Sequence, residues 1–136
     1  MTPLRFLNIW LGVGVALVAL VAYLSLKPDP LDAGHFHGVK VGHFIAYATL
    51  MLWFSQIFRS TPGRIAVSLS LALLGVVLEY LQGATGYRTF AYSDMRDNTL
   101  GVIAGLTLGY AGLGELLGRL DGWLAHIWTT RDSLQK

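Results

Sequence analysis

The sequence contains no cysteine, which excludes disulfide bonds and thiol chemistry. Charged side chains are scarce, at 13% of the 136 residues, against about 25% in an average soluble domain. No run of basic residues exists and the formal net charge is only +2, which argues against nucleic acid as a partner. Neither the Ser-His-Asp order of a hydrolase nor a glycine-rich phosphate loop is present. Any chemistry therefore rests on a small number of polar side chains.

What the sequence does have is apolar residues, which form 54% of the chain. Residues 6–26 are 21 positions without a charge, enough for a helix across a hydrocarbon core of about 30 Å. Signal peptides have a shorter apolar region and a small-residue cleavage site, so we expect this helix to be retained. Similar runs cover residues 41–58, 65–82 and 97–118. We predict an all-α polytopic membrane protein, a single domain over residues 1–136 with a bundle of four transmembrane helices.

Polar segments separate and follow these helices. Residues 83–93, between the third and fourth helix, are a polar loop that we expect to be covered by protein or water if it lies at membrane depth. An amphipathic pattern at residues 116–128 predicts a C-terminal helix lying in the membrane interface. Arg119, Asp121 and His126 avoid its apolar face.

Three glycines recur every four residues in the fourth predicted helix, at Gly101, Gly105 and Gly109. Small residues at this spacing form a ridge that allows two helix backbones to approach closely. We interpret the ridge as a packing surface rather than as a ligand groove, and we predict that the fourth helix meets another helix along it.

The distribution of basic residues predicts the orientation. If the N-terminus lies inside, the inner side carries Arg5, Arg59, Arg64, Arg119, Arg131 and Lys136, and the outer side carries Lys27, Lys40, Arg88 and Arg96. Basic residues are more frequent on the cytoplasmic side of membrane proteins. We therefore expect a multi-pass protein of the cytoplasmic (inner) membrane, with both termini in the cytoplasm and two polar loops outside.

Polar side chains from three predicted helices lie at the same depth in the membrane, at its outer edge. Ionisable groups at such a position are costly and mark functional sites by default. We expect them to converge into one cluster in which Glu79 contacts Arg88, Lys40 or His43. The cluster comprises Lys40, His43, Tyr47, Glu79, Gln82, Arg88, Asp94 and Asn98.

Two kinds of role are open for this cluster. In an enzyme, Glu79, His43 and Asp94 are the candidates for proton transfer. Alternatively, the polar groups pair with one another and clamp the helices, or form a binding surface without catalysis. No ligand spacing typical of zinc appears, so we expect neither a metal nor a cofactor. The expected binding residues are Arg88, Lys40, Gln82, Asn98 and Tyr47; the two cations suit a phosphate or carboxylate.

The ordered set of polar residues over positions 39–110 resembles the VanZ-like membrane proteins. Their pattern is a lysine before His-Phe-x-x-Tyr, then Glu-x-x-Gln near a helix end, followed by Arg, Asp, Asn and spaced glycines. Many members carry an Asp directly before the lysine, where this chain has Val39. The matching residues are Lys40, His43, Phe44, Tyr47, Glu79, Gln82, Arg88, Asp94, Asn98, Gly101 and Gly105.

The resemblance implies a small bacterial integral membrane protein with a role in the cell envelope. The namesake of the family is associated with resistance to the glycopeptide teicoplanin. The expected partners are the lipid bilayer itself and, from the location and charge of the cluster, an anionic lipid or a lipid-linked substrate.

The orientation can be tested with cysteines introduced at Gly34 and Thr85, because the chain has no cysteine of its own. Both positions lie in the predicted outer loops, so both should react with an impermeant thiol reagent added to intact cells, after permeabilisation of any outer membrane. Labelling that occurs only in broken cells would reverse the orientation.

Overall fold

The computed structural model describes residues 4–28 and 38–133. These residues form helices only, so the described part of the chain is all-α. The elements are α1 (Leu7–Leu26), α2 (Gly38–Ile57), α3 (Thr61–Ala84), α4 (Tyr92–Tyr110), the 3-10 turn η1 (Leu113–Glu115) and α5 (Leu116–Ser133).

Length and composition make α1 and α3 capable of crossing a membrane. A third crossing is available if α4 and its continuation, bent by 76°, are taken as one span. The described helices therefore support two or three crossings by this criterion, fewer than the predicted four. Two features account for the difference: only Val41–Ile57 of α2 is apolar, and the first turns of α4 contain Asp94, Arg96 and Asp97.

Apolar side chains cover the outer faces of the long helices. Val15 of α1 is 64% exposed, and Leu69 and Leu73 of α3 are 67% and 63% exposed. Contiguous exposed apolar surface on this scale is rare in soluble monomers and is typical of a surface covered by a membrane or a partner. The class of the protein is thus an integral membrane protein.

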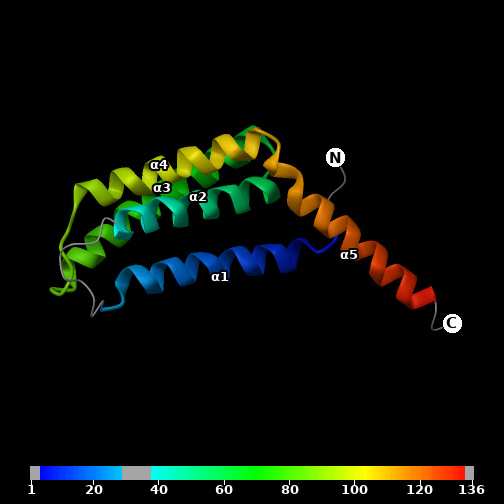
Figure 1. Cartoon of the computed structure of the whole chain (residues 1–136), viewed down its shortest axis with the longest axis horizontal. Helices are drawn as coiled ribbons and strands as arrows, with labels where there is room; N and C mark the ends of the chain where they lie inside the picture. Colours follow the sequence, from blue (N-terminus) through cyan, green and yellow to red (C-terminus); the bar gives the residue numbers. More distant parts are fainter. Residues whose placement is uncertain (1–3, 29–37, 134–136) are drawn as a thin grey trace.

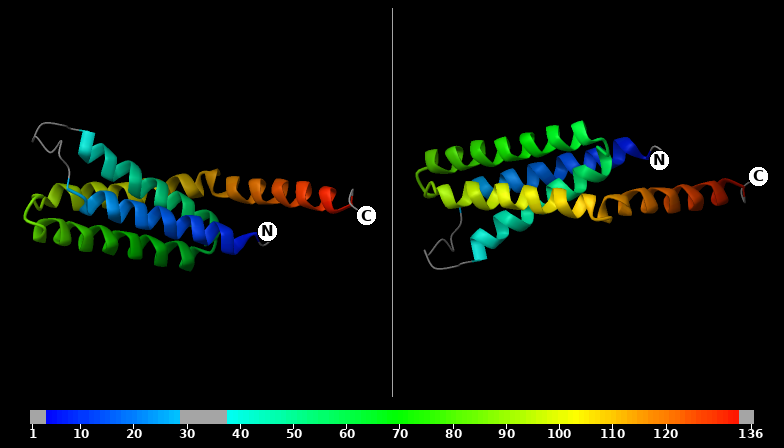
Figure 2. Two further views of the ribbon diagram at one scale, coloured as in Figure 1. Left: turned by 90° about the horizontal axis from the view of Figure 1, so that it is seen from below. Right: turned by 90° about the horizontal axis from the view of Figure 1, so that it is seen from above.

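The helices α1, α3 and α4 run alongside one another, and α2 crosses them obliquely, so that its first turns diverge from the bundle (Figure 2). The apolar core lies where α2 meets α3 and α4 and includes Tyr47, Met51, Leu71 and Val102. The helix α5 leaves the bundle at the end opposite the loop between α3 and α4 and continues away from it (Figure 1).

The start of α3 is set by a capping interaction that the apolar pattern did not reveal. The hydroxyl of Ser60 accepts a hydrogen bond from the backbone N–H of Gly63 (3.2 Å), and Pro62 occupies the first turn. Both features favour helix initiation. The helix therefore begins at Thr61, four residues before the predicted start, and includes the buried Arg64.

The glycine ridge of α4 packs against α2, which confirms the predicted role of these residues. A Cβ atom at Gly101 would collide with the carbonyl oxygen of Phe44, and one at Gly105 with that of Ala48. At Gly109 it would meet the hydroxyl of Ser55. The contact between α2 and α4 is the most extensive in the structure. Only glycine permits this approach of two backbones.

The predicted fourth helix is divided in two. It ends at Tyr110 rather than near residue 118, and Gly112 adopts a left-handed conformation (φ 106°) that other residues rarely adopt. The chain then turns through η1 into α5, which begins at Leu116 and extends to Ser133. The break directs α5 away from the bundle.

The buried Asp121 of α5 accepts three hydrogen bonds at the start of α1. The donors are the backbone N–H groups of Arg5 (2.7 Å) and Phe6 (3.0 Å) and the indole N–H of Trp10 (2.7 Å). The N–H groups at a helix start lack helical partners and favour negative charge. The sequence pattern placed Asp121 only off the apolar face of its helix; these partners could not be predicted, because they lie more than 110 residues away along the chain.

The amphipathic pattern predicts an interfacial position for α5, so we expect Asp121 to lie outside the membrane-spanning segments. Burial raises the pKa of Asp121, but the hydrogen bonds from Trp10, Arg5 and Phe6 and the charge of Arg5 outweigh burial. The pKa therefore lies below its ordinary value of 3.8. A lowered pKa in the folded state means that ionised Asp121 stabilises the fold above that value and that this contribution is lost on acidification.

Replacement of Gly105 by Leu should lower the free energy of unfolding by about 1–3 kcal/mol or more, since the side chain would force α2 and α4 apart. Thermal unfolding in detergent measures this change. The matched control is Gly122→Leu, because a Cβ at Gly122 meets nothing within 4 Å. Equal midpoints for Gly105→Leu and the parent protein would contradict the packing role.

Replacement of Asp121 by Asn should lower thermal stability at neutral pH and remove part of the stability loss below about pH 4, where the parent carboxylate becomes protonated. The measurement is the unfolding midpoint as a function of pH. Glu115→Gln is the control, since Glu115 is an exposed acid of the same region. A pH profile of Asp121→Asn identical to that of the parent would show that the ionised cap contributes nothing.

Candidate functional site

The polar cluster lies at the end of the bundle where α1 and α3 end and α2 and α4 begin (Figure 1). The loop from Thr85 to Ala91 joins α3 to α4 at this end. Side chains from α2, α3, α4 and this loop meet here, together with backbone groups of the last turn of α1.

Glu79 is 1% exposed and connects α3 to the start of α4. One carboxylate oxygen, Oε1, accepts a hydrogen bond from the backbone N–H of Ala91 (2.6 Å). The other oxygen, Oε2, is buried and has no hydrogen-bond partner among the described residues. Glu79 also lies within electrostatic range of His43, Arg88 and Asp94. The structure thus places His43, Arg88 and Asp94 around the carboxylate of Glu79, of which one oxygen has a hydrogen-bond partner and the other has none within the described residues.

The predicted direct contact of Glu79 with Arg88 or His43 is absent. Within the described part of the chain, the ion pair that forms joins Arg96 to Asp97 instead (2.9 Å), at the exposed surface of α4. The backbone N–H of Ala91 is the hydrogen-bond partner of Glu79, where we expected a cationic side chain. The pattern of side chains in the sequence could not indicate a backbone partner. The side chain of Lys40 lies outside the described part of the structure.

Arg88 and Gln82 both hold the C-terminal end of α1. The Nη1 atom of Arg88 (3.0 Å) and the Nε2 atom of Gln82 (2.8 Å) donate to the carbonyl oxygen of Ser25. The hydroxyl of Tyr87 donates to the carbonyl of Leu26 (2.6 Å). Carbonyl groups in the last turn of a helix lack helical partners and favour a nearby cation. The loop after α3 therefore docks on α1.

His43 and Asn98 join α2 to α4. The Nδ1 atom of His43 lies 3.1 Å from Oδ1 of Asn98, and because an amide oxygen only accepts, Nδ1 is the donor in this contact. Asn98 is buried and also touches α3, where a Cβ at Gly75 would lie 3.1 Å from the Cβ of Asn98. Asn98 therefore lies where α2, α3 and α4 meet.

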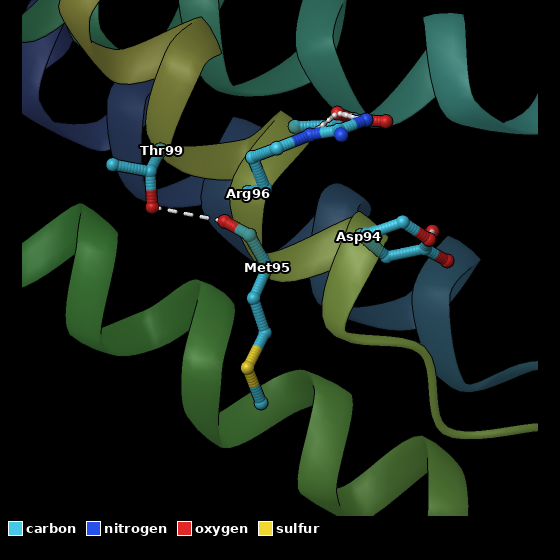
Figure 3. Close-up of polar contacts among 6 residues, drawn as sticks. Asp94, Met95, Arg96 and Thr99 are labelled. Carbon is cyan, nitrogen blue, oxygen red and sulfur yellow. Dashed lines mark hydrogen bonds and ion pairs between the residues drawn. The ribbon is translucent and has the colours of Figure 1, made fainter.

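Asp94 stands in the first turn of α4, where it suits the positive end of the helix dipole. The hydroxyl of Ser93 donates to its Oδ1 atom (3.0 Å). The side chains of Asp94, Met95 and Arg96 leave α4 in different directions, and Thr99 donates to the carbonyl of Met95 (Figure 3). Asp94 contributes to the field around Glu79 without a direct bond to it.

A pocket of about 280 Å³ lies beside the cluster, between the last turns of α1 and the first turns of α2. None of the described residues that line it carries a carboxylate. Lys27 was not among the predicted site residues; its position directly after the first apolar run was the available signal. The polar residues of the lining are Ser25, Lys27, His43, Tyr47 and Arg88. Its other residues are Val21, Leu24, Gly42 and Ala46.

The wall of this pocket contains an unsatisfied polar group. Tyr47 is 1% exposed, and its hydroxyl has no hydrogen-bond partner within the described residues. It lies within electrostatic range of Glu79. Buried polar groups in proteins are nearly always paired, so a buried carboxylate oxygen and hydroxyl without partners are typical of a site that receives a ligand or water. No three His, Cys, Asp or Glu side chains in residues 4–28 and 38–133 lie close enough to hold a metal ion.

These features define a helical membrane protein with a cation-lined pocket at one end of its bundle. Comparisons with models of protein families, with curated proteins and with solved structures found no match.

Proposed function

We propose that this chain is a VanZ-like integral membrane protein of the bacterial cell envelope, and that its pocket binds an anionic envelope lipid or a lipid-linked head group. The observation that carries the proposal is the lining of the pocket, in which the described charged residues are Arg88 and Lys27 and both are basic. An anion is the complementary ligand for such a lining, and a planar guanidinium suits phosphate or carboxylate.

The proposed topology has four crossings, formed by α1, α2, α3 and α4, with α5 in the interface of the cytoplasmic leaflet. The close contact of α2 with α4 supports a crossing for each of them, because the short apolar stretch of α2, Val41–Ile57, packs along α4. Exposed apolar residues of α5 support an interfacial position. They are Leu116, Leu120, Trp123, Ile127 and Trp128.

Binding is better supported than catalysis. His43 lines the pocket and could transfer a proton, but Glu79 and Asp94 lie outside the lining. The pocket also offers no activated nucleophile. A reaction would therefore depend on His43 and Tyr47 alone, whereas binding requires only the cations and hydrogen-bond donors that are present.

The alternative is a purely structural clamp. It is favoured by the bonds of Gln82 and Arg88 to the carbonyl of Ser25, which tie α3 and its loop to α1. A clamp leaves the pocket and the unpartnered hydroxyl of Tyr47 without a role. Binding accounts for both sets of observations, since Arg88 can hold α1 through one nitrogen and an anion through another.

Anionic lipid should stabilise the protein through Arg88. We expect the unfolding midpoint to rise by several degrees when phosphatidylglycerol replaces part of the phosphatidylcholine in nanodiscs, and Arg88→Gln to lose most of that rise. Arg96→Gln is the control, because Arg96 lies at the same end but is 67% exposed and pairs with Asp97. Equal loss in both variants, or none in Arg88→Gln, would contradict a specific anion site.

Glu79→Gln separates binding from the clamp in the same assay. Its amide oxygen can still accept from Ala91, so the fold should persist while the charge is removed. If the variant is less stable but shows the full lipid effect, Glu79 is a structural residue. If it is stable and the lipid effect changes, Glu79 acts on the bound anion.

A comparison of envelope lipids between a deletion strain and its parent would detect chemical conversion of a lipid by the protein.

A further inference from the structure

On its α1 side, the lining of the pocket changes from polar at the end of the bundle to apolar deeper within it. On α1, Lys27 and Ser25 stand at the end of the bundle, and Leu24 and Val21 lie deeper. On α2, His43 stands one turn nearer to the end than Ala46. A ligand that contacts the whole lining therefore has a charged end at the membrane edge and an apolar part that points toward the membrane interior.

The pocket also opens at the side of the bundle. The first turns of α2 diverge from the other helices (Figure 2). Leu24 on the α1 side is 45% exposed. Gly42 on the α2 side is exposed, and a Cβ atom there would meet nothing within 4 Å. The two walls thus leave a crevice that faces the lipid.

We infer that this crevice admits its ligand sideways from the bilayer, and that the ligand is a phosphate carried on a hydrocarbon chain rather than a free phosphate. The inference rests on the proposed function of the pocket. The phosphate contacts Arg88 and Lys27, and the first carbons of the chain lie against Val21, Leu24 and Ala46.

The volume supports partial enclosure of such a ligand. At about 280 Å³ the pocket lies at the lower end of the range for ligand pockets, which is about 300–1,000 Å³. It holds a phosphate and the start of one chain, and the remainder of the chain stays in the lipid between α1 and α2. The positive charge of Arg88 and Lys27 supplies the charge complementarity, and the apolar inner wall distinguishes a lipid phosphate from a soluble one.

The test compares dodecyl phosphate with inorganic phosphate on the full-length protein in phosphatidylcholine nanodiscs, with thermal stabilisation as the readout. We expect dodecyl phosphate to raise the unfolding midpoint and inorganic phosphate at the same concentration to have no effect. Gly42→Phe should weaken the apparent affinity for dodecyl phosphate at least tenfold, because the ring occupies the crevice. Gly12→Phe is the control: a Cβ there also meets nothing within 4 Å, and Gly12 does not line the pocket.

The outcomes separate this inference from the proposed function. If inorganic phosphate stabilises the protein as well as dodecyl phosphate does, or Gly42→Phe binds as the parent does, sideways entry is wrong although the anion site stands. If Arg88→Gln binds dodecyl phosphate with the affinity of the parent, the anion site itself is wrong. Should Gly42→Phe fail to fold, Ala46→Leu narrows the same crevice by fewer atoms and is expected to weaken binding in the same direction.

Discussion

The close contact of α2 and α4 is the constraint on which the rest of the structure depends. Three glycines of α4 face backbone and small side-chain atoms of α2, so that the two helices are held at a distance that other residues do not allow. This contact fixes His43 of α2 beside Asn98 of α4. Because association in lipid relies on packing and hydrogen bonds rather than on the hydrophobic effect, a glycine ridge is an effective way to join two helices there.

The other helices are arranged around this pair by polar groups at the two ends. At one end, Arg88 and Gln82 hold the last carbonyl groups of α1, while Glu79 accepts from Ala91 at the start of α4. At the other end, Asp121 holds the first N–H groups of α1. The helix α1 is therefore held by hydrogen bonds at both termini, and between them Leu17 and Val18 pack against the core. This arrangement leaves room for a pocket between α1 and α2.

The sequence was sufficient to predict the helical class, the approximate helix positions and the glycine ridge, because apolar run length and residue spacing are local signals. It also indicated which end of the bundle would carry the polar cluster. It did not predict the partners within that cluster, since Glu79 and Arg88 both bind backbone groups of distant segments, and backbone groups have no signature in a sequence. The break at Gly112 was missed because the apolar pattern continues through it.

The position of Asp121 has a consequence for biosynthesis. The carboxylate that caps α1 is separated from Arg5 by 116 residues, so nearly the whole chain must be translated before the cap can form. Until then the first N–H groups of α1 depend on water or lipid head groups for hydrogen bonds. The cap of α1 therefore forms only after Asp121 has been synthesised.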